Sequence, residues 1–246
     1  MAKYYFISDV HLGTNTVKDN KIHEKKLVDW LSMAQKDATA IFLVGDIFDF
    51  WFEYKRVVPQ GFVRVFGKLC EIIDSGIDVH FFIGNHDLWT FGYFENEIGL
   101  KVHRTPQIFE LNGKKVFVAH GDGLNEKSKF FSFVRGLFHN RFLQRCFAAL
   151  PTNLGMWLGQ TLSNRNRRKH DRQNVNFLGE ENENLVLFAK KMNKPQQIDH
   201  YIFGHRHILL NLQLSKSSQM IILGDFLHEF SYAVLDENGL NLQKNF

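Results

Sequence analysis

The sequence predicts an α/β protein with a mainly parallel β-sheet, and three observations support that fold class. Short apolar runs alternate with segments of helical spacing through the first half of the chain. The chain has 246 residues and 44% hydrophobic content, which is enough to bury a sizeable core. It also lacks internal repeats and long linkers, so we expect a single domain over residues 1–246.

The N-terminal half has a β-α-β-α-β pattern. Apolar runs at 4–8, 40–44 and 79–83 predict three buried strands, and residues 27–34 and 62–73 show helical spacing between them. This alternation is typical of parallel strands joined by right-handed helical crossovers. Two later apolar runs predict further strands of the same kind, at 116–119 and 200–203.

The C-terminal part changes character after a helix that is predicted around Leu185 and Met192. Turn-forming residues such as Ser215 to Ser218 and Asp236 to Gly239 separate short strand-like runs. These runs lie at 209–214, 220–223, 231–235 and 240–243. We therefore expect an antiparallel meander at the end of the chain.

A basic and aromatic segment separates the two halves. Residues 127–170 contain nine Lys or Arg and no Asp or Glu, so the rest of the chain has a net charge of −5. The segment shows helical spacing from Phe130 to Phe138 and a break at Pro151. One interpretation is a helix pair whose phenylalanines complete the core beneath solvated arginines. The other is a surface for an anionic partner, such as phosphate, nucleic acid or an anionic membrane.

Cysteine content and the N-terminal residues bear on the compartment. The two cysteines, Cys70 and Cys146, have apolar neighbours, which predicts buried thiols in a reducing environment. The first residues, MAKYYFISD, do not have the pattern of a signal peptide, and no segment has the composition of a membrane span. We therefore expect a cytoplasmic protein.

Residues with metal-ligand side chains follow almost every predicted parallel strand. These residues are Asp9 and His11, Asp46 and Asp49, Asn85 to Asp87, His120 and Asp122, and His205 and His207. The carboxyl ends of strands in an open α/β sheet border the ligand crevice, so these side chains are expected to converge. Each motif alone is weak, because Gly-Asn-His-Asp also suits a turn, but five in order favour one site.

The residue types indicate the chemistry of that site. Imidazoles and carboxylates together suit first-row transition metals, and a carboxylate can bridge two ions. Two ions about 3.5–4 Å apart can hold a hydroxide and clamp the oxygens of an in-line phosphoryl displacement. The sequence therefore predicts hydrolysis of a phosphoester or phosphoanhydride.

The ordered pattern D-x-H, G-D-x-x-D, G-N-H-D/E, H and G-H-x-H resembles that of the calcineurin-like metallophosphoesterases. The resemblance covers nearly the whole chain and implies mixed β-sheets in a sandwich flanked by helices, with a helical insertion at 124–170. Within this family, SDVHLG, GDIFDFW and HGDGL are similar to the UDP-2,3-diacylglucosamine pyrophosphohydrolases of lipid A biosynthesis. That subfamily commonly has arginine where His86 stands, so the chain departs there toward the general family pattern.

The resemblance implies roles for the motif residues. One metal would be held by Asp9, His11 and His207, the other by Asn85, His120 and His205, and Asp46 would bridge them. We expect two divalent transition-metal ions, with Mn²⁺ as the first choice and Zn or Fe as alternatives. His86 would donate to a phosphoryl oxygen or to the leaving group, oriented by Asp49 or Asp87. Asp122 would support a metal ligand or face the substrate, in preference to the alternative of only capping a turn.

The resemblance also implies a substrate. The insertion would cap the site, with candidate phosphate and glucosamine contacts at Arg165, Asn166, Arg167, Arg168 and Lys169. Candidates for contact with acyl chains or the membrane are Phe130, Phe131, Phe138, Phe142 and Trp157. The implied enzyme lies at the cytoplasmic face of the inner membrane and cleaves UDP-2,3-diacylglucosamine to UMP and 2,3-diacylglucosamine 1-phosphate (lipid X).

Two other functions are open at this level. A different metal-dependent phosphodiesterase would act on nucleic acid or nucleotides, because a basic aromatic surface also suits a polynucleotide. A non-catalytic binding protein on the same fold is the third possibility, and the complete ligand set argues against it. If the chain is instead the UDP-2,3-diacylglucosamine pyrophosphohydrolase that the resemblance implies, its partner is an acylated nucleotide-sugar and we expect no nucleic acid partner.

Overall fold

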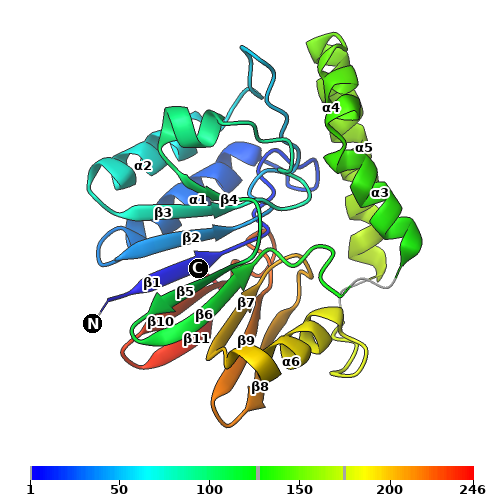
Figure 1. The fold of residues 1–246 in the computed structure, drawn as a ribbon. Helices are drawn as coiled ribbons and strands as arrows, with labels where there is room; N and C mark the ends of the chain where they lie inside the picture. Colours follow the sequence, from blue (N-terminus) through cyan, green and yellow to red (C-terminus); the bar gives the residue numbers. More distant parts are fainter. Residues whose placement is uncertain (1, 126–127, 174–175) are drawn as a thin grey trace.

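The computed structural model describes residues 2–125, 128–173 and 176–246, except for the side chains of residues 166–173 and of Lys194. Two mixed β-sheets pack face to face, and helices cover their outer faces (Figure 1). This arrangement confirms the predicted sandwich of mixed sheets flanked by helices.

The first sheet has six strands in the order β11-β10-β1-β2-β3-β4. Its strands are β1 (Tyr4–Ile7), β2 (Ala40–Val44), β3 (Asp78–Phe82), β4 (Lys101–His103), β10 (Tyr232–Asp236) and β11 (Gly239–Gln243). Strands β1 to β4 are parallel, whereas β10 pairs antiparallel with β1 and with β11. The connecting helices are α1 (Asn20–Ala34), α2 (Val63–Asp74) and a π-helical turn, η1 (Phe94–Ile98).

The second sheet has five strands in the order β5-β6-β7-β9-β8. They are β5 (Gln107–Leu111), β6 (Lys114–Ala119), β7 (His200–Phe203), β8 (Leu209–Ser215) and β9 (Ser218–Leu223). Strands β6, β7 and β9 are parallel, and β5 and β8 are antiparallel edge strands. Helix α6 (Asn184–Gln196) precedes β7 and packs on this sheet through Leu185 and Ala189.

The predicted C-terminal meander is wrong. The β8–β9 hairpin belongs to the second sheet, whereas the β10–β11 hairpin returns to the first sheet beside β1. The strands at 116–119 and 200–203 also lie in the second sheet and do not extend the first. Turn signals mark where hairpins bend, but the sheet that each hairpin joins depends on contacts distant in sequence.

Three apolar layers hold the strand ends in place. Phe6 and Phe42 of the first sheet meet Val118 and Ile221 of the second in the central layer. The outer layers lie between each sheet and its helices, as with the buried Trp30 of α1. Such close-packed layers are hardly compressible, so the loops that follow the strands start from fixed points.

The insertion forms three helices beside the carboxyl ends of the strands (Figure 1). They are α3 (Lys129–His139), α4 (Arg141–Ala148) and α5 (Thr152–Gln173). The predicted break at Pro151 is present, and a second break occurs at Asn140, whose side chain accepts from two backbone N–H groups of α4. No residue of α3 or α4 is buried, which argues against the interpretation in which their phenylalanines complete the core. Cys146 is likewise exposed, contrary to expectation.

Candidate active site

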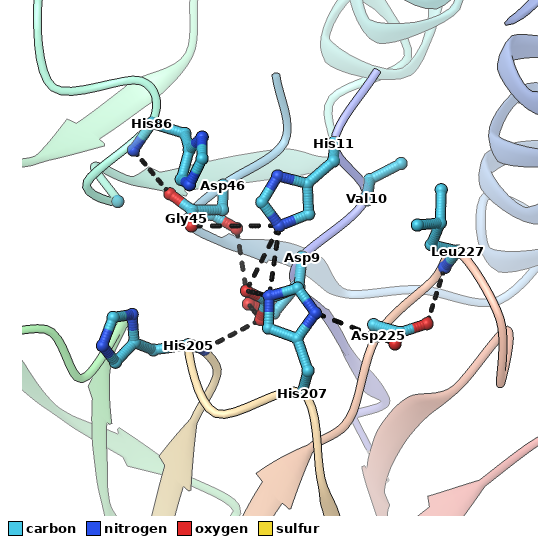
Figure 2. Close-up of polar contacts among 12 residues, drawn as sticks. Asp9, Val10, His11, Gly45, Asp46, His86, His205, His207, Asp225 and Leu227 are labelled. Atoms are coloured by element: carbon cyan, nitrogen blue, oxygen red, sulfur yellow. Dashed lines mark hydrogen bonds and ion pairs between the residues drawn. The ribbon is translucent and has the colours of Figure 1, made fainter. Parts of the chain in front are cut away.

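The loops after β1, β2, β3, β6 and β7 converge at one edge shared by the two sheets. Figure 2 shows several of their side chains pointing toward one another from both sheets. Three groups have ligand atoms within 4.8 Å of one another. The groups are Asp9, His11 and His207; His11, Asp46 and His86; and Asp46, His120 and His205.

The first half of this cluster is built around Asp9. Its Oδ1 lies 3.2 Å from His207 Nε2 and 3.7 Å from His11 Nε2, and the two Nε2 atoms are 3.3 Å apart. Oδ2 accepts hydrogen bonds from Ser8 Oγ at 2.6 Å and from the His205 backbone N–H at 2.9 Å. Oδ1 is buried and faces the two imidazoles. One oxygen is therefore fixed by the protein, and the other faces the imidazoles.

The second half is built around His120. Its Nδ1–H donates to the carbonyl of Val44 at 2.9 Å, so in the neutral ring the lone pair is on Nε2. Nε2 lies 3.3 Å from Asn85 Oδ1 and 3.3 Å from Asp46 Oδ2. His205 completes this half. An imidazole nitrogen, an amide oxygen and a carboxylate oxygen thus share one small space.

Asp46 lies between the two halves. Its Oδ2 is 3.3 Å from His120 Nε2 and 4.0 Å from His11 Nε2, while Oδ1 accepts from the His86 backbone N–H at 2.8 Å. A side chain on Gly84 would overlap Asp46, so glycine is required for this approach. The position of one oxygen between both halves fits a carboxylate that bridges two ions.

Unusual backbone conformations place these ligands. Five of the seven predicted metal ligands have φ between 50° and 67°, namely Asp9, His11, Asp46, His205 and His207. A non-glycine residue in this left-handed region costs about 1–3 kcal/mol and persists only where its surroundings hold it. Such strain concentrates at functional sites, which agrees with the chemistry of the cluster.

The charges of the cluster stabilise one another. Burial disfavours the charged form of Asp46, but the imidazoles of His120 and His86 outweigh burial and hold its pKa well below the usual range. Burial also opposes the protonation of His207, yet the nearby Asp9 and Asp225 raise its pKa to about 10. Protons on the imidazoles thus supply positive charge between carboxylates. Divalent cations would supply it in their place, and this donor set of imidazole, carboxylate and amide suits first-row metals.

The residues that surround His86 differ in part from the expectation. His86 Nδ1–H donates to the backbone carbonyl of Asp49 at 2.7 Å and lies 2.9 Å from Ser163 Oγ. The Asp49 carboxylate lies 3.6 Å from His11 Nδ1, and Ser163 Oγ lies 3.1 Å from its Oδ2. Asp87 accepts from the Gly84 and Ile47 backbones and holds two loops together. The hydrogen bond between Asp49 and the His86 ring is thus made by the Asp49 main chain.

Sequence reasoning missed two residues beside the cluster. Ser163 of α5 is buried and donates to the Asp49 carbonyl at 2.6 Å, which brings the insertion into the site. Asp225 follows β9 and lies with Oδ2 3.8 Å from His207 Nδ1, while three backbone N–H groups donate to Oδ1. The Gly224-Asp225 pair repeats the pattern of Gly45-Asp46, so a signal for Asp225 was present.

Helix α5 reaches the site because small residues face the β2 loop. Any side chain on Gly155 would meet Tyr54, and any on Gly159 would meet the ring of Phe50. Ser163 is the next residue at this four-residue spacing, which places all three on one helix face. The helix can therefore approach closely enough for Ser163 to contact Asp49.

The remaining predicted residues, Asp122 and those of the insertion, do not belong to the ligand cluster, or their side chains lie outside the described residues. Asp122 accepts from Arg135 of α3 at 3.0 Å, at the start of the insertion. Phe130, Phe142 and Trp157 are exposed, with 76%, 70% and 62% of their surface accessible. Phe131 and Phe138 are also exposed, at 37% each, and Arg165 is exposed on α5. The side chains of Asn166, Arg167, Arg168 and Lys169 lie outside the described residues.

Two mixed sheets with a His/Asp cluster compatible with two metal ions at their shared edge define a metal-dependent hydrolase. The family of calcineurin-like phosphoesterases matches residues 2–209, and the chain belongs to that family. A UDP-2,3-diacylglucosamine hydrolase from Porphyromonas gingivalis is 37% identical and covers 98% of this chain and 97% of its own length. Hydrolases of the same name from Actinobacillus succinogenes and Haemophilus influenzae are 25% and 26% identical, over 92% and 97% of both chains.

Proposed function

We propose that the protein hydrolyses the pyrophosphate bond of UDP-2,3-diacylglucosamine to UMP and 2,3-diacylglucosamine 1-phosphate. The observation that carries this proposal is the convergence of two ligand groups on Asp46, in a chain similar over its full length to hydrolases of that name. Phosphoanhydride cleavage concentrates negative charge on phosphoryl oxygens, and two cations beside one another can stabilise it.

The ligand cluster divides into two candidate metal positions. Asp9, His11 and His207 would hold one ion, and Asn85, His120 and His205 the other. Asp46 Oδ2 would contact both. When bound, the ions would supply Lewis-acid charge at the phosphoryl group. Mn²⁺ is the proposed metal, with Zn or Fe as alternatives, because the donor set accepts all three.

His86 is proposed as the proton or hydrogen-bond donor to the reacting phosphate. The Asp49 carbonyl accepts from Nδ1–H, so Nε2 is the nitrogen left to act, in a ring that lies close to His11 and Asp46. A neutral imidazole in this orientation accepts a proton at Nε2, and an imidazolium donates one. Ser163 assists by fixing the Asp49 carbonyl.

The insertion is proposed to receive the acylated end of the substrate. Its surface combines exposed aromatic side chains with arginines and lysines, which suits acyl chains next to phosphates. The same surface supports peripheral association with the cytoplasmic face of the inner membrane. None of the helices in the described part of the chain has both the length and the apolar character that crossing a membrane requires.

A substrate screen tests this function. The metal-loaded protein is assayed in mixed micelles with the diacylated and the non-acylated UDP-sugar, a cyclic nucleotide and single-stranded DNA. We expect rapid release of UMP from the diacylated substrate alone, and none from the Asp46→Ala protein. Faster hydrolysis of DNA or cyclic nucleotide, with salt-dependent binding and no need for detergent, would support the alternative phosphodiesterase.

A further inference from the structure

We propose that Arg206 and Glu183 form a positioning pair that holds the turn carrying His205 and His207 in metal-binding geometry. The inference rests on the proposed dinuclear site and adds two residues that neither bind metal nor touch substrate. Arg206 stands between the two histidines in the Gly-His-Arg-His segment after β7. Glu183 immediately precedes α6.

The contact between the two side chains is bidentate and largely shielded from solvent, with Glu183 buried and Arg206 partly buried. Arg206 Nε lies 2.7 Å from Glu183 Oε1, and a terminal guanidinium nitrogen lies 3.1 Å from Oε2. The exposed fractions of the side chains are 11% and 1%. A guanidinium that meets both oxygens of a carboxylate fixes orientation as well as distance. The pair therefore fixes the direction in which the turn leaves β7.

The turn needs such support because its own conformation is unfavourable. His205 and His207 both lie in the left-handed region, with φ of 67° and 52°. Two backbone contacts anchor its beginning: Gly204 donates to the His120 carbonyl, and His205 donates to Asp9. The Arg206 side chain anchors the following position, between the two ligands.

The Glu183 side chain binds Arg206 and does not cap its own helix. It occupies the N-cap position of α6, where Ser, Thr, Asp and Asn are preferred, and its side chain accepts no capping hydrogen bond. The helix behind it is firmly placed, since the buried Leu185 packs within the second-sheet core and beside Gly121. Glu183 therefore links the ligand turn to a rigid element.

The expected role differs from simple stabilisation. Replacing a buried ion pair by apolar residues of similar volume is often neutral for folding, whereas removing one partner leaves an uncompensated charge. A double replacement consequently separates positioning from stability. If the pair only stabilised the fold, metal affinity would be unchanged in any variant that folds.

The test compares Glu183→Met/Arg206→Met with a matched control, Glu180→Gln/Lys190→Met. The control removes an exposed ion pair, 2.6 Å long, from the same segment and the same helix. Mn²⁺ affinity and stoichiometry are measured by calorimetry, and the Tm of the metal-free proteins is measured in parallel. We expect ~10–100-fold weaker Mn²⁺ binding in the test variant, as for other residues that orient metal ligands, and unchanged binding in the control.

Mn²⁺ binding as tight as in the control would overturn the proposal. If the double variant does not fold, Arg206→Lys decides, because lysine keeps the charge but cannot form the two-pronged contact. Reduced Mn²⁺ affinity in that variant supports the proposal, and unchanged affinity overturns it. These readouts need no substrate. A wild-type protein that binds two Mn²⁺ ions but leaves UDP-2,3-diacylglucosamine intact would therefore contradict the proposed function and not this pair.

Discussion

Asp46 is the residue on which both halves of the ligand cluster depend. Because its Oδ2 faces His120 on one side and His11 on the other, Asp46→Ala should lose more metal than any other single ligand replacement. Elemental analysis of the purified variant, beside Asp9→Ala and His120→Ala, measures this loss. Full occupancy in Asp46→Ala would show that Asp46 does not bridge.

His86 should affect turnover without affecting metal content. His86→Ala removes a donor at the reacting phosphate, so kcat should fall by ~10²–10⁴. Metal content should stay near the wild-type value, because His86 is not one of the proposed ligands. His86→Arg should retain part of the activity if phosphate contact is its main task, since guanidinium donates hydrogen bonds but is too weak an acid to protonate a leaving group. A parallel loss of metal and activity in His86→Ala would make His86 a ligand.

For single residues, the sequence predicted which side chains belong to the ligand cluster better than it predicted the groups that hydrogen-bond to them. The convergence of the strand ends follows from alternating elements and from ligand types at their carboxyl ends, so the cluster was predictable. The contact between His86 and the Asp49 main chain was not, because carbonyl direction depends on loop conformation. Ser163 was missed because it comes from α5, far away in sequence.

Among the elements, α5 depends on two glycines, Gly155 and Gly159, for its close approach to the β2 loop. Gly159→Leu would force a branched side chain against Phe50, and overpacking of this kind costs about 1–3 kcal/mol. We therefore expect faster amide hydrogen exchange along α5. Gly136→Leu in α3 is the matched control, because a Cβ atom there meets no described atom within 4 Å. Equal exchange in both variants would show that the contact with Phe50 does not hold the helix.

The predicted elements agree best where the apolar pattern is continuous. Strands β1, β2 and β3 and helices α1 and α2 appear near the expected positions because each has a clear buried run or face. The short β4 and the β5 edge strand were not predicted, since their residues are largely exposed or only partly buried. The two terminal hairpins were predicted as strands, but their division between sheets depends on pairing with β1 and β7.

For the molecule as a whole, a histidine pair between β3 and β4 should make stability depend on pH. His80 Nδ1 lies 2.8 Å from His103 Nε2, and His80 stacks on Phe42. Burial, followed by the charges of His103 and Lys101, lowers the pKa of His80 to about 4. Since the unfolded chain takes up the proton first, His80 should reduce stability as pH falls from about 6.5 toward 4.

Urea unfolding at pH 7.5 and pH 5 measures this effect. The loss of stability between the two pH values should be smaller in His80→Phe than in the wild type, because phenylalanine keeps the stacking and cannot be protonated. Both proteins contain the same ligand cluster, so its contribution to the pH dependence of the free energy of unfolding cancels when the two are compared. The same pH dependence in both would contradict the role of His80.

The charge distribution of the whole chain was also informative. The basic residues from Lys129 to Lys169 fall on helices that stand beside the carboxyl ends of the strands, where the ligand cluster lies (Figure 1). Composition alone predicted a partner-binding surface or core-completing helices, and only the exposure of the aromatic side chains distinguishes them. Exposure depends on how the helices pack, which helical periodicity does not specify.

The central claim is that the strand ends of two sheets form one site for two metal ions. Anomalous diffraction from crystals grown with Mn²⁺ tests it most directly. We predict two peaks about 3.5–4 Å apart, one beside Asp9, the other beside His120, with Asp46 in contact with both. A single peak, or two peaks that do not share Asp46, would contradict this account.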